Sequence, residues 1–190
     1  MIITHHGGNY FKFQAGQLTL LVDPIDQRSF RGAQAVLNTT LPAHADQPSE
    51  TPPAWIAHAG EYEVQGIEIQ GWSSGHDGKT EHTAYRVVMD DIAVGILGHL
   101  TGELSEDALE GLSGVDILLV PAGGKPWIAE AAAAKLAREL APSLVIPSLT
   151  KDPKVFLKAF GRTSPKTEEK LVVKKKDLPP GALNVVCLSS

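Results

Sequence analysis

Val115-Asp116-Ile117-Leu118-Leu119-Val120-Pro121-Ala122-Gly123-Gly124 is the stretch of sequence that decides the fold. Its apolar run, from Asp116 to Pro121, has the length of a buried strand. The alanine-rich segment from Ile128 to Leu140 predicts a helix, which leads through Pro142 into a second apolar strand, Leu144 to Pro147. This order of strand, helix and strand predicts an α/β fold.

The residues before this unit predict mainly strands. A hairpin with its turn at Ala15-Gly16-Gln17 ends at Asp23-Pro24, and a turn at Asp90-Asp91 precedes a later strand. The other expected strands are Gln34 to Leu37, Trp55 to Ala57, Tyr62 to Gln70, Ala84 to Met89, Ile92 to Leu97, Leu171 to Val173 and Asn184 to Leu188. The other expected helices run from Ser105 to near Gly111 and from Pro153 to Phe160.

Composition narrows the possible classes of protein. A length of 190 residues with 43% hydrophobic residues predicts one well-cored domain over residues 1–190. The net charge of −5 gives no reason to expect nucleic acid as a partner. Cys187 is the only cysteine, so the chain can form neither an internal disulfide nor a zinc site made of thiolates. Without a leader-like or membrane-spanning apolar segment, we expect a cytoplasmic protein that does not bind membranes.

Several motifs in a fixed order resemble the metallo-β-lactamase fold, and more closely its small metal-dependent hydrolases related to ascorbate-6-phosphate lactonase. They are Asp23-Pro24, His44-Ala45-Asp46, Gly60-Glu61-Tyr62-Glu63-Val64, His76-Asp77-Gly78, Leu97-Gly98, the stretch from Val115 to Gly124, and Val145-Ile146-Pro147. The resemblance covers nearly the whole chain. It implies an αββα sandwich of two mixed sheets flanked by helices, with a metal site at one edge of the sheets.

The resemblance also implies that part of the metal site is missing. The ligand loop of the family reads His-x-His-x-Asp-His, and Pro42 and Gln47 stand here where the first and last histidines would be. His44 and Asp46 remain from this loop. Since a two-metal hydrolase needs six or seven donors and a bridging carboxylate, the loop alone argues against an intact centre.

The other ligand segments differ in how well they are kept. His76 fits the third ligand segment, in which a His is followed by Asp or Gly. His99 stands where the bridging Asp follows a Leu-Gly pair, and Leu149 replaces the final His of an Ile-Pro-Met-His segment. The sequence therefore predicts a degraded dinuclear site.

Two classes of function remain open. In the first, His44, His76 and His99 bind one Zn or Mn ion, and Asp46 is a fourth ligand or the base in hydrolysis of an ester, lactone or phosphoester of unknown identity. In the second, the chain binds no metal and is an inactive member of the fold that serves as a binding or structural module. An oligomer is compatible with either class.

Each candidate residue also has a structural interpretation. Asp46 can bond backbone amides in a turn, His76 lies in a segment typical of exposed turns, and His99 can be a buried histidine at the end of a strand. Gly123-Gly124 suits either an anion-binding turn or a tight turn between strand and helix. The remaining histidines are weaker candidates, and His58 and His82 are expected at the surface.

Overall fold

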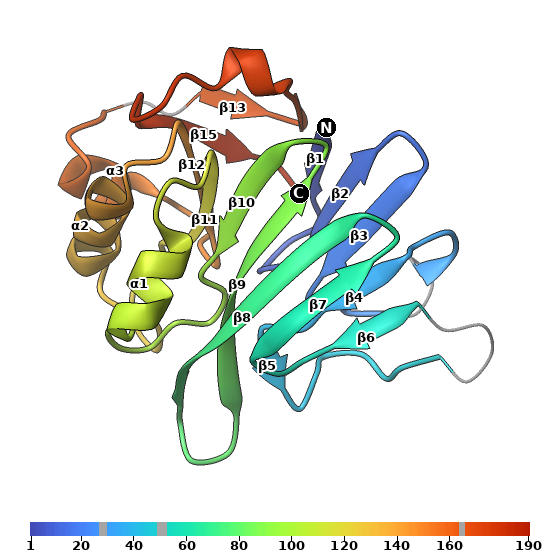
Figure 1. Cartoon of the computed structure of the whole chain (residues 1–190). Helices are drawn as coiled ribbons and strands as arrows, with labels where there is room; N and C mark the ends of the chain where they lie inside the picture. The colour runs from blue at the N-terminus through green and yellow to red at the C-terminus, as the bar shows by residue number, and fades with distance from the viewer. Residues whose placement is uncertain (27–29, 49–52, 164–165) are drawn as a thin grey trace.

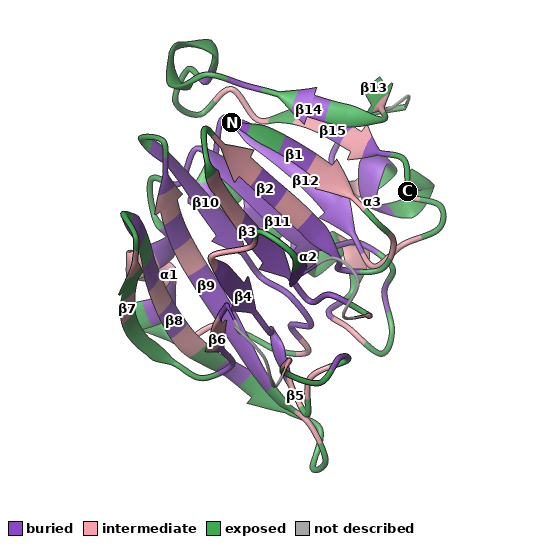
Figure 2. Cartoon of the chain, turned by 90° about the vertical axis from the view of Figure 1, so that its right-hand side faces the viewer, coloured by how far each residue is buried: buried purple, intermediate pink, exposed green. Residues whose placement is uncertain are grey.

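Apolar and polar residues alternate along the N-terminal hairpin, so one face of each strand lies in the core. In the computed structural model, which describes residues 1–26, 30–48, 53–163 and 166–190, Phe11 and Phe13 are almost fully buried. Lys12 and Gln14, which lie next to them in the sequence, are only half-buried because successive side chains of a strand point to opposite faces. Figure 2 shows the same alternation of burial along several other strands.

The hairpin belongs to a mixed sheet of six strands in the order β14-β1-β2-β3-β4-β6, all labelled in Figure 2. Strand β4 pairs in parallel with β3 and with β6, and the other pairs are antiparallel. The strands of this sheet are β1 (Ile2–His5), β2 (Phe11–Ala15), β3 (Leu18–Val22), β4 (Ala35–Leu37), β6 (Ala54–Ile56) and β14 (Lys170–Val172).

The second sheet has nine strands in the order β13-β15-β12-β11-β10-β9-β8-β7, with β5 paired to β9. Its strands are β5 (Thr40–Leu41), β7 (Gly60–Val64), β8 (Ile67–His76), β9 (Glu81–Met89), β10 (Ile92–Ile96), β11 (Ile117–Pro121), β12 (Leu144–Ser148), β13 (Lys166–Glu168) and β15 (Asn184–Leu188). Apolar side chains of the two facing sheets form the main core, which includes Phe13, Leu37, Ile69, Ile96 and Ile146.

Three α-helices in the described part of the chain lie against the outer face of the nine-stranded sheet (Figure 1). They are α1 (Glu106–Leu112), α2 (Glu130–Leu140) and α3 (Lys154–Ala159). Ser105 caps α1, since its side chain accepts a hydrogen bond from the amide of Ala108. The predicted sandwich of two mixed sheets with flanking helices is confirmed.

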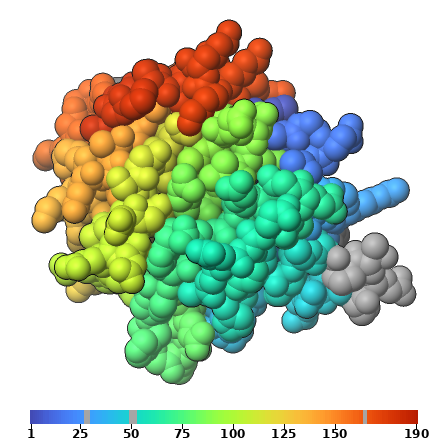
Figure 3. Space-filling model, in the orientation of Figure 1, coloured from blue at the N-terminus to red at the C-terminus, as the bar shows by residue number. Residues whose placement is uncertain are grey.

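One predicted strand is in fact two. Residues 62–70 are divided between β7 and β8 by a tight turn at Gln65-Gly66, where both φ angles are positive, at 53° and 86°. Two residues with positive φ make the hairpin turn whose twist matches that of the flanking strands. The chain therefore reverses here, and β8 continues into a long hairpin with β9 whose tip projects from the body of the molecule (Figures 1 and 3).

The parallel strands bring three loops to one edge of the nine-stranded sheet. Strands β10, β11 and β12 run in the same direction, so the segments after Ile96, Pro121 and Ser148 leave the sheet at the same edge. These segments contain His99, the glycine pair Gly123-Gly124 and Leu149. This edge is where the sequence predicts the metal site.

No helix in the part of the chain that the structure describes is long and apolar enough to cross a membrane.

Candidate functional site

A buried carboxylate anchors the site. Asp23 follows β3 with a positive φ of 44° and is 2% exposed. Its Oδ2 accepts hydrogen bonds from Asn9 Nδ2 at 2.6 Å and from Thr39 Oγ1 at 2.5 Å, and its Oδ1 accepts one from the amide of Thr39 at 2.6 Å. Three donors thus replace the water that the carboxylate loses on burial.

The same threonine hydroxyl holds His99. Its Oγ1 lies 2.7 Å from Nδ1 of His99, which is 3.5 Å from Oδ2 of Asp23. Because the hydroxyl proton of Thr39 is directed to Asp23, the oxygen is left to accept, and Nδ1 of His99 is the donor. The Nε2 of a neutral His99 ring therefore carries the lone pair.

Gly98 allows this close approach. It has a positive φ of 56°, and a Cβ atom at this position would lie only 2.4 Å from Cβ of Thr39. Any side chain here would push the loop that carries His99 away from Thr39. The Leu-Gly pair before His99 therefore has a steric role at the site.

Three aromatic rings surround the His99 ring. Their centroids lie 4.7 Å away for Trp127, 5.4 Å for His44 and 6.3 Å for His82. Trp127 meets His99 edge to face at an interplanar angle of 70°, and its centroid is 6.4 Å from that of His82. The result is a cluster of imidazole and indole rings, which we call the histidine cluster: His44, His82, His99 and Trp127.

Burial lowers the pKa values of the two inner histidines of this cluster, His82 and His99. The pKa of His99 is lowered mainly by burial, with a further lowering from His44 and His82 and an opposing effect of Asp23. The pKa of His82 is also lowered mainly by burial, against the opposing charges of Asp77 and Asp23. His82 is 2% exposed, and its Nδ1 has no hydrogen-bond partner among the described residues.

The structure brings together only some of the predicted ligands. His44 is exposed in the loop after β5, and its ring contacts that of His99, while Asp46 lies two residues further in the same exposed loop. His76 is exposed at the end of β8, where its Nδ1 accepts a hydrogen bond from the amide of Gly78 at 3.2 Å. Within the described ranges, no three His, Cys, Asp or Glu side chains are grouped so that they could hold one metal ion. In this arrangement, the predicted donors do not fit a site in which three or more of them bind one metal ion.

Leu149 and the glycine pair form a tight backbone contact at the same edge. Leu149 has a positive φ of 54°, and its amide donates a hydrogen bond to the carbonyl of Gly8 at 3.0 Å. A Cβ atom on Gly123 would lie 2.1 Å from the carbonyl oxygen of Leu149. The glycine at position 123 is thus required by backbone packing, which favours its interpretation as a tight turn.

His82 and Trp127 are parts of the cluster that sequence reasoning missed. The sequence predicts both His58 and His82 at the surface, and this is correct for His58 but wrong for His82. His82 is covered because β5 pairs with β9, with Thr40 opposite His82 in the register. Since β5 is only two residues long and lies about forty positions earlier in the chain, no local pattern at His82 indicates this cover.

Comparisons with known proteins agree with this architecture. Residues 2–148 match the model of a family described as the beta-lactamase superfamily domain. A protein of the metallo-beta-lactamase superfamily from Thermotoga maritima, proposed to be a Zn-dependent hydrolase, is 24% identical with a TM-score of 0.76, over 98% of this chain and 97% of that chain. No curated protein matches the sequence.

Two further solved structures share the fold at lower identity. The metallo-beta-lactamase fold protein YhfI from Bacillus subtilis is 11% identical with a TM-score of 0.66, over 98% of this chain and 90% of that chain. Igni18, a metallo hydrolase from the archaeon Ignicoccus hospitalis, is 15% identical with a TM-score of 0.65, over 99% of this chain and 94% of that chain.

Proposed function

The chain belongs to the beta-lactamase superfamily, and we propose that within it this protein is a metal-dependent-hydrolase-like member whose two-metal centre is degraded. The observation that carries the proposal is the placement of His99. The resemblance puts a bridging carboxylate at this position, and here an imidazole is bound through Thr39 to Asp23 and lies against Trp127. A neutral imidazole cannot offset the charge of two cations as a bridging carboxylate does.

The proposal limits the protein to one metal ion at most. His44 and His99 are the predicted ligands whose rings are in contact, and Asp46 and His76 are the other donors the sequence supplies. The ion would be Zn or Mn, and the reaction at most hydrolysis of an ester, a lactone or a phosphoester. The closer relation to ascorbate-6-phosphate lactonase stays a prediction, as does a small molecule rather than nucleic acid or membrane as the partner.

Metal content tests this proposal directly. We would purify the chain without a histidine tag or chelator, equilibrate it with Zn or Mn, remove free metal and measure bound metal by mass spectrometry. The expected result is one equivalent or less for each chain, with any bound metal lost in His44→Ala and kept in His58→Ala, since His58 is exposed and makes no ring contact with the cluster. Two tightly held equivalents per chain would show that the dinuclear centre is intact.

A second candidate, an inactive member that serves as a binding or structural module, is favoured by the way aromatic rings fill the space beside His99. Trp127 and the buried His82 both lie against His99, on the ring that a metal ion would have to reach. Under this alternative, neither the natural chain nor Trp127→Ala would hydrolyse model esters, lactones or phosphodiesters with metal present. Hydrolysis by the natural chain that His44→Ala abolishes would exclude the alternative.

A further inference from the structure

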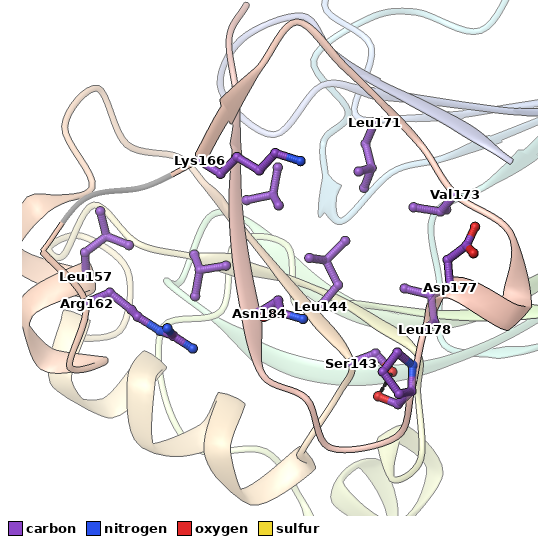
Figure 4. A pocket seen from close by; sticks show the side chains of 13 residues that line it. Ser143, Leu144, Leu157, Arg162, Lys166, Leu171, Val173, Asp177, Leu178 and Asn184 are labelled. Carbon is purple, nitrogen blue, oxygen red and sulfur yellow. Dashed lines mark hydrogen bonds between the residues drawn. The ribbon is translucent and has the colours of Figure 1, made fainter.

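One cavity outside the histidine cluster lies at the starts of β12 and β15 and has a volume of about 380 Å³ (Figure 4). Of its lining residues, Val185 packs against the core beneath the helices, and Val186 belongs to the core between the sheets. The lining is therefore divided between the two faces of β15. Polar side chains, among them Arg162, Asp177 and Asn184, are interspersed with the apolar ones, so this cavity favours no single class of ligand.

A groove on the outer side of the nine-stranded sheet is more uniform. It lies between α1 and α2, beside the loop of residues 102–104, and has a volume of about 340 Å³. Helix α2 packs against α3, whereas α1 lies over β8 and β9 (Figure 1). In the described part of the chain, the helical layer is thus closed between α2 and α3 and open between α1 and α2.

The floor of the groove is apolar. Ile128, Ala132 and Leu136 follow one another at intervals of four residues, which places Ala132 and Leu136 on one face of α2. Leu104 and Leu109 line the groove from the side of α1. Leu104, Leu109 and Leu136 pack against the core beneath the helices, yet all three are only half-buried. Apolar surface of three leucines therefore stays open to solvent in one place.

The charges at the groove are mainly negative. Glu103 and Glu139 line it, and Glu106 and Glu110 are exposed on α1. None of these four carboxylates makes an ion pair with a residue that the structure describes. The segment that forms the α1 side contributes no cation, because residues 101–124 contain no lysine or arginine.

The two acids of the lining stand towards opposite ends of α2. The amide of Ile128 donates a hydrogen bond to the carbonyl of Leu100 at 2.9 Å, which fastens the loop that carries Glu103 to the start of α2. Glu139 lies in the last turn of the helix. Lys135, one turn before Glu139, is the cation of the lining, so the groove is acidic towards its ends and has a positive charge between them.

We propose that this groove binds an amphipathic helix of a partner protein, with leucine-like side chains on its apolar face and lysine or arginine beside them. A helix that lies in a groove between two others completes a packed helical layer. Its apolar face covers Leu104, Leu109 and Leu136, and its cations pair with Glu103 and Glu139. The groove shares no residue with the histidine cluster and does not depend on the function proposed for it.

The probe is a helical peptide of leucine and lysine with its leucines three and four positions apart. Fluorescence anisotropy of the labelled peptide is expected to show saturable binding of one peptide by the full chain, with weaker binding as the salt concentration rises. One control peptide has glutamate in place of each lysine, and another has the same composition with its leucines dispersed around the helix. Both should bind more weakly, since the first is repelled by the acids and the second has no apolar face.

Two exposed alanines of α2 offer a matched test of the apolar part. Ala132→Trp fills the groove and is expected to abolish binding of the leucine-lysine peptide. Ala131→Trp adds the same side chain at the neighbouring position, outside the lining, and should leave binding unchanged. Circular dichroism of both variants checks that the chain stays folded.

Charge variants test the acidic part. Glu139→Lys should weaken peptide binding about fivefold, since a surface ion pair is lost and a repulsion is gained. Lys135→Glu should strengthen binding, because it removes the positive charge of the lining. Glu169→Lys is the control, since Glu169 is exposed next to β14 and outside the lining.

The proposal is overturned if the leucine-lysine peptide shows no saturable binding, or if Ala132→Trp binds it as the natural chain does. It is also overturned if the glutamate peptide binds as tightly as the lysine one, or if Glu139→Lys does not weaken binding. Self-association of the natural chain that Ala132→Trp abolishes, measured by sedimentation, would instead assign the groove to a second copy of this chain.

Discussion

The hydroxyl of Thr39 lies 2.7 Å from Nδ1 of His99, a residue sixty positions later in the chain. The same hydroxyl donates its proton to Asp23, so one threonine joins the end of a strand of the first sheet to a loop of the second. Asp23, Thr39 and His99 are 2%, 0% and 4% exposed, so these bonds are shielded from water. This geometry makes the threonine hydroxyl the group on which the position of His99 depends.

Replacing this hydroxyl should destabilise the protein. Thr39→Val keeps the shape of the side chain but leaves buried polar atoms of Asp23 and His99 with one partner fewer, at an expected cost of about 1–3 kcal/mol in the free energy of unfolding. Urea unfolding followed by circular dichroism measures it. Thr39→Ser should recover most of the loss. Thr83→Val should cost less, since Thr83 is also buried but the hydrogen bond from its hydroxyl to the carbonyl of Ala57 is long, at 3.4 Å. Equal stability of Thr39→Val and the natural chain would contradict the prediction.

The histidine cluster should make the protein sensitive to acid. The pKa values of His82 and His99 are lowered in the folded state, so the unfolded chain binds more protons at these positions than the folded chain. The contribution of His82 and His99 to the free energy of unfolding is present above pH 6.5 or so, about the pKa of histidine in the unfolded chain. It is lost as the pH falls towards the lowered pKa values of these residues in the folded chain. We expect the free energy of unfolding to decrease between neutral pH and about pH 5.

Urea unfolding at several pH values, with matched histidine variants, tests this origin. His82→Gln should reduce the dependence of stability on pH in this interval, because Gln does not titrate. His58→Gln is the matched control, since it also removes one histidine but at an exposed position outside the cluster. A pH dependence that His82→Gln does not alter would place its origin elsewhere in the chain.

Gly98 offers a test of the contact between the two sheets. Gly98→Ala combines an unfavourable positive φ with a clash against Thr39, so we expect a loss of stability larger than the roughly 1 kcal/mol typical of the φ effect alone. Gly16→Ala is the control, because its φ of 58° is close to the 56° of Gly98 and nothing lies within 4 Å of the added Cβ. Thermal or urea unfolding of both variants separates the clash from the backbone strain. Similar losses in both would show that the loop moves aside at no cost.

The two members of a partly buried ion pair, Asp116 and Lys175, should contribute unequally to the free energy of unfolding. Asp116 accepts hydrogen bonds from the amide of Ala93 at 2.8 Å and from Nζ of Lys175 at 2.7 Å, and its side chain is 9% exposed against 54% for Lys175. Asp116→Ala leaves the buried amide of Ala93 without its partner, so it should cost about 1–3 kcal/mol. Lys175→Met removes the two hydrogen bonds from Nζ to Asp116, at 2.8 and 2.7 Å, but it leaves the bond from the amide of Ala93 in place. Because the lysine side chain is half-exposed, water can take its place, and the variant should cost less, about 0–1 kcal/mol. Urea unfolding of the two variants measures the difference, and a larger cost for Lys175→Met would contradict this account.

The fold could be predicted because its strongest signals are local. The apolar run before Gly123, the alanine-rich segment that forms α2 (Glu130–Leu140) and the turn at Asp90-Asp91 each define an element by nearby residues. The order of the motifs then indicates the family. The sequence does not indicate the turn at Gln65-Gly66, because glutamine is not a typical residue for positive φ. The alternation of apolar and polar residues therefore predicts one continuous strand there.

The site could be predicted only in part. The positions of His44 and His99 follow from the motif order, and the structure brings their rings into contact. The bonds from Thr39 to Asp23 and His99, the burial of His82 and the position of Trp127 all depend on segments far apart in the sequence. Such contacts depend on the packing of the two sheets against each other, and no local sequence pattern predicts that packing.

The pairing of β14 with β1 and of β15 with β12 means that the part of the chain matching the family is shorter than the unit that must fold. The match ends at residue 148, yet strands beyond it complete both sheets. A chain shortened to the matched segment would leave Ile2 to Thr4 and the edge of β12 unpaired, open to edge-to-edge aggregation. During synthesis, the six-stranded sheet lacks its edge strand β14 until residues 170–172 have left the ribosome, so this sheet is completed late.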